Sequence, residues 1–108
     1  MPPPFTLRWT EHAVTQLAAL AEYISLDSPF YAEQVVDRVV ERLEQARRHP
    51  KSGRVVPELG REDVRELIEA PYRLIYRMRA DAVEVLSILH GRQQLRELPG
   101  ASASRPTG

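Results

Sequence analysis

The sequence contains no cysteine, which excludes disulfide bonds and metal sites built on thiolates. It also contains no apolar run close to the ~20 residues that a membrane-spanning helix needs. The first four residues, MPPP, lack the basic and apolar regions of a signal peptide. We therefore expect a cytoplasmic protein without a membrane segment, since a chain free of cysteine is compatible with a reducing compartment.

The sequence also lacks net charge and, apart from Lys51, lacks lysine. A dedicated nucleic-acid binder is usually basic, so the balance of charges counts against that class. Almost all the cations are therefore arginines, which suit planar recognition of carboxylates or phosphates. A GC-rich genome is an alternative explanation of this preference for arginine over lysine. The cations gather in two groups, which are Arg47, Arg48, Lys51 and Arg54, with no acid between them, and Arg73, Arg77, Arg79, Arg92 and Arg96.

The N-terminal half predicts one strand and two helices. Residues 5–9 alternate as a strand does, and Thr10 follows as a helix N-cap. The first helix stops at Asp27, after which Ser28 and Pro29 cap and begin a second helix that Pro50 ends. Two helices joined by so short a break are expected to form an antiparallel hairpin. The apolar positions are Ala13, Leu17, Leu20 and Ile24 in the first helix and Ala32, Val35, Val36, Val39, Leu43 and Ala46 in the second.

The C-terminal half predicts three strands. Residues 51–63 are rich in turn formers and are expected to be a loop. Residues 64–69, 72–78 and 83–90 then follow a strand period, with turns at Ala70-Pro71 and Ala80-Asp81. The element order is therefore β-α-α-β-β-β, an α+β fold in which a helical hairpin packs on a small antiparallel sheet. Residues 1–98 form the expected domain, and residues 99–108, which are small and polar, are expected to be a disordered tail.

A two-residue turn at Ala80-Asp81 would set the register of the last two strands. The expected cross-strand pairs are Arg77 with Glu84, Tyr76 with Val85 and Ile75 with Leu86. The face expected to pack on the helices carries Tyr72, Leu74, Tyr76, Met78, Val83, Val85 and Leu89. The opposite face carries Arg73, Ile75, Arg77, Glu84, Ile88 and His90. That second face is mixed and partly charged, which suits a functional site or a partner.

Short motifs along the chain resemble those of a known family. They are Tyr23-Ile24 with Asp27-Ser28-Pro29 and Ala32, His49-Pro50, Ser52-Gly53-Arg54, Pro57-Glu58, Val64-Arg65-Glu66, Tyr72-Arg73-Leu74-Ile75-Tyr76-Arg77 and His90-Gly91-Arg92. In this order and spacing, over about residues 5–98, they look like the RelE/ParE superfamily of toxins. The resemblance implies a curved antiparallel sheet with two N-terminal helices on one face, which agrees with the element order predicted above.

The resemblance also implies a role in a bacterial type II toxin–antitoxin system, with a cognate antitoxin protein as partner in a hetero-oligomer. ParE-like members inhibit DNA gyrase, whereas RelE-like members cleave mRNA on the ribosome without a metal. We favour the ParE-like activity. The alternatives are the RelE-like endonuclease and a decayed toxin that serves only as an antitoxin-binding module.

RNA cleavage without a metal needs a general base, a general acid and cations around the phosphate. The resemblance places Arg73 and Arg92 at phosphate-holding positions, and His90 has a side chain suited to proton transfer. RelE carries two lysines where this chain has Val64 and Glu66, and no tyrosine follows Gly91. These departures favour a non-enzymic inhibitor, although Glu66 with His90 stays open as a different acid–base pair.

The candidate target-binding residues are Arg65, Arg73, Arg77, His90 and Arg92. Three of them have a structural role as the alternative. His90 could cap a carbonyl, Arg77 could pair with Glu84 at the surface, and Arg65 could pair with neighbouring acids. The histidines lack metal-site spacing, so no metal and no cofactor are expected.

Overall fold

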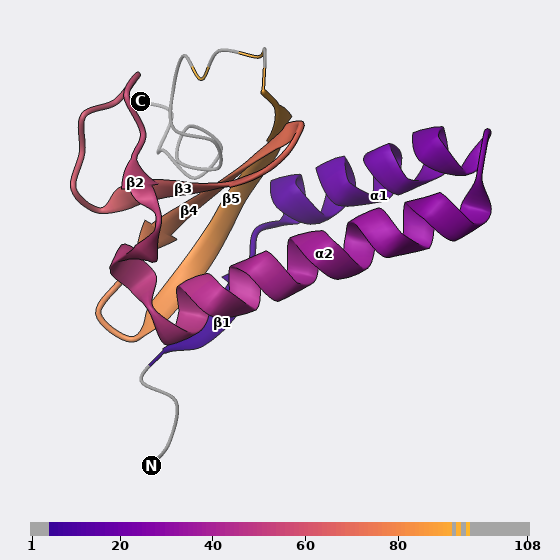
Figure 1. Ribbon diagram of the computed structural model, residues 1–108. Helices are drawn as coiled ribbons and strands as arrows, with labels where there is room; N and C mark the ends of the chain where they lie inside the picture. Colours follow the sequence, from indigo (N-terminus) through magenta and orange to yellow (C-terminus); the bar gives the residue numbers. More distant parts are fainter. Residues whose placement is uncertain (1–4, 92, 94, 96–108) are drawn as a thin grey trace, which may run out of the picture.

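The computed structural model describes residues 5–91, 93 and 95, and it shows two helices and a five-stranded sheet (Figure 1). The α+β class and the predicted order of the main elements are confirmed. The elements are β1 (Thr6–Trp9), α1 (Glu11–Ser25), α2 (Pro29–Arg48), the 3-10 turn η1 (Pro50–Ser52), β2 (Arg54–Val55), β3 (Val64–Glu69), β4 (Tyr72–Met78) and β5 (Ala82–His90). The predicted boundary at residue 98 and the predicted tail lie outside the described residues.

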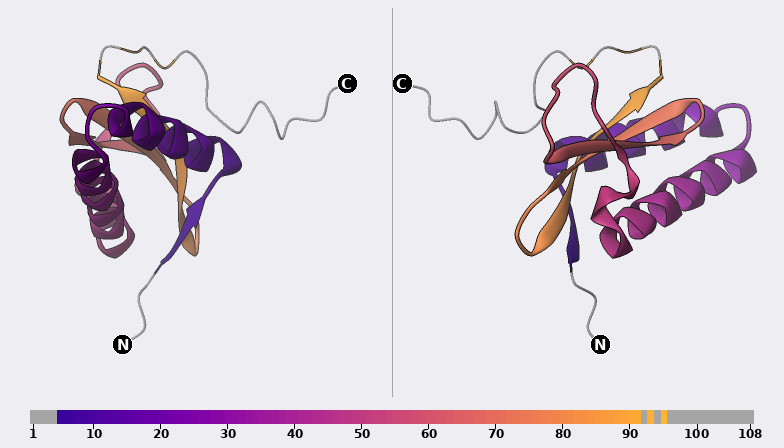
Figure 2. Two further views of the ribbon diagram at one scale, coloured as in Figure 1. Left: turned by 90° about the vertical axis from the view of Figure 1, so that its right-hand side faces the viewer. Right: turned by 60° about the vertical axis from the view of Figure 1, so that its left-hand side comes forward.

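Both helices begin at the predicted caps. The Thr10 hydroxyl accepts a hydrogen bond from the Ala13 amide at 3.1 Å, and the Ser28 hydroxyl accepts one from the Tyr31 amide at 3.1 Å. Each cap satisfies an amide that the first helical turn would otherwise leave unpaired. Pro29 occupies the start of α2, where its missing N–H costs nothing. The two helices run antiparallel on the same face of the sheet (Figures 1 and 2).

The sheet is mixed, which corrects the expectation of an antiparallel sheet. Its order is β1-β5-β4-β3-β2, and β1 pairs with β5 in parallel, with Thr6 opposite Ala82. This pairing joins residues about 75 positions apart, so no local pattern could indicate it. The two-residue strand β2 and the turn η1 were also missed, because β2 falls within the predicted loop and η1 overlaps its start.

The register of β4 and β5 is as predicted near their turn and wrong beyond it. Arg77 lies opposite Glu84, and Met78 lies opposite Val83, whereas Ile75 lies opposite Ser87 rather than Leu86. A β-bulge therefore inserts one extra residue into β5. An inserted residue shifts every later side chain of that strand to the other face of the sheet.

The bulge moves the last residues of β5 away from their predicted faces. Ile88 packs in the core beneath the helices, whereas Leu89 packs on the opposite face. His90 lies opposite Tyr72 and makes an edge-to-face contact with it, with ring centroids 6.2 Å apart. His90 therefore shares a face with Tyr72 and not, as predicted, with Arg73.

Two apolar clusters lie on the two faces of the sheet. The larger one fills the space between the helices and the sheet, and Val39, Leu43 and Tyr76 are fully buried in it. The second one lies on the opposite face and includes side chains of the loop after β2 and Leu95. Its buried members are Val56, Val64, Ile75, Leu86, Leu89 and Leu95. The face that we expected to be open and mixed is thus partly covered.

We predict that Leu43→Ala lowers the free energy of unfolding by about 2–5 kcal/mol, because the side chain is fully buried and its loss leaves a cavity. Val40→Ala, on the same helix but 38% exposed, should change it by about 0.5 kcal/mol or less. Chemical denaturation of both variants measures the difference. Equal effects would show that the buried face of α2 is assigned incorrectly.

Candidate functional site

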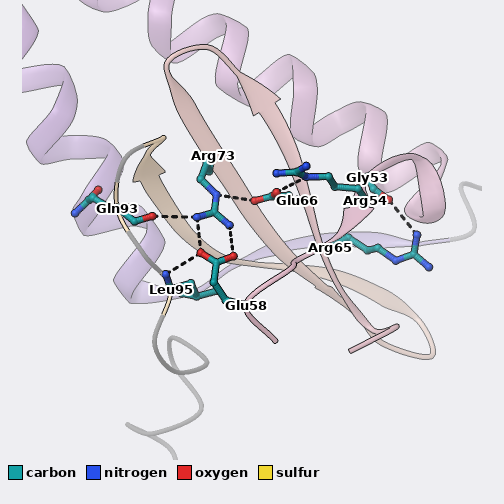
Figure 3. Close-up of polar contacts among 8 residues, drawn as sticks. All are labelled: Gly53, Arg54, Glu58, Arg65, Glu66, Arg73, Gln93 and Leu95. Carbon is teal, nitrogen blue, oxygen red and sulfur yellow. Dashed lines mark hydrogen bonds and ion pairs between the residues drawn. The ribbon is translucent and has the colours of Figure 1, made fainter. Parts of the chain in front are cut away.

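A line of alternating charges crosses the face of the sheet that the helices do not cover (Figure 3). Arg54 on β2 lies opposite Glu66 on β3, and the two side chains form an ion pair. Arg73 on β4 lies diagonally from Glu66 and pairs with its other carboxylate oxygen at 2.7 Å. Glu58, in the loop between β2 and β3, completes the line. Adjacent strands bring these residues together because diagonal neighbours on one face are within reach of long side chains.

The Arg73 guanidinium is buried at the centre of this line. Its Nε donates to Glu66, and its Nη1 and Nη2 donate to the two Glu58 oxygens at 2.7 and 2.8 Å. Nη1 also donates to the Gln93 carbonyl at 3.0 Å, and the Leu95 amide donates to Glu58 at 3.1 Å. Arg73 thus holds the loop and the last described residues against the sheet.

Arg73 and Glu58 each stabilise the charged form of the other. The hydrogen bonds from Arg73 lower the pKa of Glu58 to about 2. The Glu58 carboxylate, followed by that of Glu66, raises the pKa of Arg73 above its usual range. Since Arg73 is only 6% exposed, a phosphate could reach it only by displacing a carboxylate. The side chain predicted to hold an anion therefore already holds two carboxylates of its own chain.

The two positions that the resemblance matched to lysines of RelE are buried in this chain. Val64 is fully buried in the second apolar cluster, and Glu66 is 1% exposed between two arginines. Neither can contribute a cation, and the chain's lysine, Lys51, lies elsewhere, in η1. The local charge around Arg73 is balanced rather than positive.

His90 is not brought together with the other predicted catalytic residues. It lies on the face of Tyr72, whereas Arg73 and Glu66 pair on the opposite face, so the alternative pair of Glu66 with His90 is not assembled either. Arg92 lies outside the described residues. His90 and Arg73 are both among the residues that line an open cleft of about 1050 Å³ at the end of the sheet. The cleft is lined by Arg54, Pro57, Glu58, Ile68, Ala70, Pro71, Tyr72, Arg73, His90 and Gly91.

The remaining predicted target-binding residues make internal contacts. Arg65 donates to the Gly53 carbonyl at 3.0 Å and pairs with Glu62. Arg77 pairs with Glu84 at 2.8 Å, as the cross-strand register predicted. Both arginine side chains are less than a fifth exposed. They stabilise the fold locally and offer few free donors to a partner.

Sequence reasoning missed a groove formed by both helices of the hairpin together with Trp9 of β1. This hairpin groove encloses about 420 Å³ and is almost entirely apolar. It is lined by Trp9, Val14, Leu17, Ala18, Ala21, Val36 and Val40. Val14, Ala18 and Ala21 form a second helical stripe on α1, displaced from the core stripe, and that spacing was the available signal. The role of Glu58 was also missed, because its partner Arg73 is fifteen residues away.

Neither a membrane span nor a metal cluster is found in the part of the chain that the structure describes. None of its helices is long and apolar enough to cross a membrane. No three of its histidine, aspartate or glutamate side chains gather in a way that could hold a metal ion.

Comparisons with known proteins give a consistent family match. Residues 7–95 match the family described as the ParE toxin of the type II toxin–antitoxin system parDE. Among solved structures, the chain resembles one titled "Chromosomal ParDE TA system from P. aeruginosa". The TM-score is 0.68 at 25% sequence identity, covering 82% of this chain and 98% of the other. No curated protein matches the chain.

We predict that the ion pair of Glu58 makes stability depend on pH. Its folded pKa, about 2, lies below the ordinary value of 4.5, so its contribution is complete above about pH 5 and is lost as the pH falls toward 2. Glu58→Gln should cost about 1.5–3 kcal/mol at pH 7 and flatten the fall in stability below pH 5. Denaturation at a series of pH values measures both.

Glu62→Gln is the matched control for this prediction. Glu62 also pairs with an arginine, Arg65, but its side chain is 85% exposed, so its loss should cost less than about 1 kcal/mol at pH 7. An acid-induced loss of stability as steep in Glu58→Gln as in the unmodified protein would contradict the assignment.

Proposed function

The chain belongs to the ParE toxin family of type II toxin–antitoxin systems, and we propose that it arrests bacterial growth by inhibiting DNA gyrase rather than by cleaving mRNA. The observation that carries this proposal is the neutralised Arg73. A guanidinium that is 6% exposed and bound by two carboxylates is a structural group and not a free phosphate ligand.

The energetic requirements of RNA cleavage support the same choice. Removing one preorganised group that stabilises transition-state charge typically slows a reaction by ~10²–10³. At this site both lysine positions of RelE are replaced by buried residues, and Arg73 and His90 project from opposite faces of the sheet. Several contributions are therefore lost together. An inhibitor that only binds needs complementary shape and charge, and these requirements do not depend on an acid and a base meeting at one phosphate.

The cleft at the end of the sheet is the surface that we assign to gyrase. Ile68 at its wall is 45% exposed, although most large apolar side chains of the sheet are buried. Arg54 has a side chain that is 64% exposed, and His90 lies at the rim. Exposed apolar surface bordered by polar groups is typical of protein interfaces. Two of the residues predicted to bind a target line this cleft. They are His90, which is exposed, and Arg73, which is buried.

The hairpin groove is the surface that we assign to the antitoxin. Its walls are apolar, and the small residues Ala18 and Ala21 let a partner approach the helix backbones closely. A second hollow of about 490 Å³ continues it through Ala21 and Val36 toward Pro29, with Glu22 and Glu33 at the sides. A groove of this kind fits an amphipathic helix that carries apolar anchors flanked by cations.

We predict growth arrest and gyrase inhibition from the protein alone. Inducing the full chain in a bacterium should stop growth, and the purified protein should reduce supercoiling by gyrase while mRNA on translating ribosomes stays intact. Cuts in the mRNA that disappear in His90→Ala or Arg73→Ala would overturn the proposal in favour of the endonuclease. Unimpaired growth with folded protein present would favour a decayed toxin that only binds its antitoxin.

We predict that the hairpin groove decides neutralisation but not toxicity. Ala18→Arg fills the groove with a long charged side chain, so co-expression of the cognate antitoxin should no longer restore growth. Thr15→Arg, at an exposed position of α1 outside the groove, should be neutralised normally. Pull-down of the two proteins measures the loss of binding. Equal rescue of the two variants would place the antitoxin on another surface.

A further inference from the structure

The exposed charges of this neutral chain are segregated. Six of the acids in the described residues form no ion pair, and all six lie on α1, on α2 or in the turn between them. They are Glu11, Glu22, Asp27, Glu33, Asp37 and Glu41. The cations in the same part of the chain that form no ion pair are Arg38, Arg48, Lys51 and Arg79. Three of these four, Arg48, Lys51 and Arg79, come after the last unpaired acid of the hairpin, Glu41, in the sequence.

Residues 48–54, which we call the basic turn, connect the end of α2 to β2, away from the tip of the hairpin (Figure 1). Arg48, His49 and Lys51 are exposed, and no acid occurs in the chain between Glu44 and Glu58. Arg54 pairs through its Nε with the buried Glu66. Its two Nη nitrogens have no hydrogen bond to a described residue, and its side chain is 64% exposed. The basic turn therefore presents cationic donors to solvent.

A buried tyrosine fixes the shape of the basic turn. The Tyr76 hydroxyl donates to the Pro50 carbonyl at 2.7 Å and accepts from the Gly53 amide at 3.0 Å. The Gly53 carbonyl accepts from Arg65 at 3.0 Å. A Cβ at Gly53 would approach the Tyr76 hydroxyl to 2.5 Å, so the chain needs glycine at this position. Cations on a backbone held in this way lose less conformational entropy when they bind.

We propose that the basic turn contacts the phosphate backbone of the duplex DNA that gyrase holds, an inference that rests on the proposed function. Arginine forks and a lysine suit phosphate oxygens, and Arg48, Lys51 and Arg54 lie within seven consecutive residues that contain no acid. The acidic hairpin would be repelled by DNA. Electrostatics therefore orients the toxin with the basic turn toward the DNA and leaves the hairpin groove for the antitoxin.

We expect few phosphate contacts. The binding to DNA should not depend on base sequence, and it should weaken as the salt concentration rises. Three phosphate contacts give a slope of about −2.7 when the logarithm of the binding constant is plotted against the logarithm of the salt concentration. Binding to DNA alone is then weak at physiological salt. In the complex with gyrase, the same contacts add to a protein–protein interface, and DNA should tighten the binding of the toxin.

The first experiment measures fluorescence anisotropy of a labelled DNA duplex with the purified full chain at ~20 mM salt and above. We expect binding with the slope given above, and Arg48→Glu or Lys51→Glu should weaken it about ten-fold. Arg38→Glu is the matched control, because Arg38 is also an exposed arginine of α2 without an ion pair. Absence of binding at low salt, or an equal loss in Arg38→Glu, overturns the inference. This experiment contains no gyrase, so its outcome is separate from that of the proposed function.

The second experiment compares the affinity of the toxin for gyrase with and without bound DNA. We expect DNA to increase the affinity, and Arg48→Glu to remove that increase while Arg38→Glu keeps it. Tyr76→Phe retains every cation but releases the turn, and it should reduce the increase while circular dichroism shows a folded chain. If Arg48→Glu weakens binding to gyrase equally without DNA, the basic turn contacts an acidic protein surface and the inference is wrong.

Discussion

The buried guanidinium of Arg73 is the constraint on which the uncovered face of the sheet depends. A charge that is 6% exposed is tolerated only when opposite charges and hydrogen bonds surround it, and here Glu66 and Glu58 supply both. Through these partners Arg73 connects β3, β4, the loop before β3, Gln93 and Leu95. Removing either carboxylate would leave a positive charge underpaired beside the second apolar cluster.

The same interaction is the main ground for our proposal that this member of the ParE toxin family is an inhibitor and not a nuclease. A phosphate-cleaving site needs surplus positive charge that meets an acid and a base, whereas this site has balanced charge and its histidine on the other face of the sheet. The described residues also form surfaces to which a partner could bind. An apolar groove lies on an acidic hairpin, a cleft lies at the end of the sheet, and the hydrogen-bonded basic turn follows α2.

The elements with strong local signals agree with the sequence-based predictions. Thr10 and Ser28 cap the helices, and the stripe that includes Val39 and Leu43 is buried. Arg77 pairs with Glu84 because the turn between their strands is short and both residues lie close to it. The predicted faces fail only past the β-bulge, where one extra residue exchanges Ile88 with Leu89 and turns His90 toward Tyr72. A bulge depends on packing on both faces of the sheet, and alternation along one strand does not reveal it.

The sequence by itself determined the class of fold, the two helices, the three main strands and the family, because periodicity, caps and short motifs are properties of neighbouring residues. The tertiary structure decided the parallel pairing of β1 with β5, the ion pairs that neutralise Arg73 and the shape of the basic turn. Each of these depends on contacts between residues that are distant along the chain. The sequence predicts that Arg73 is a cation available to a phosphate, and only folding brings Glu58 and Glu66 close enough to neutralise it.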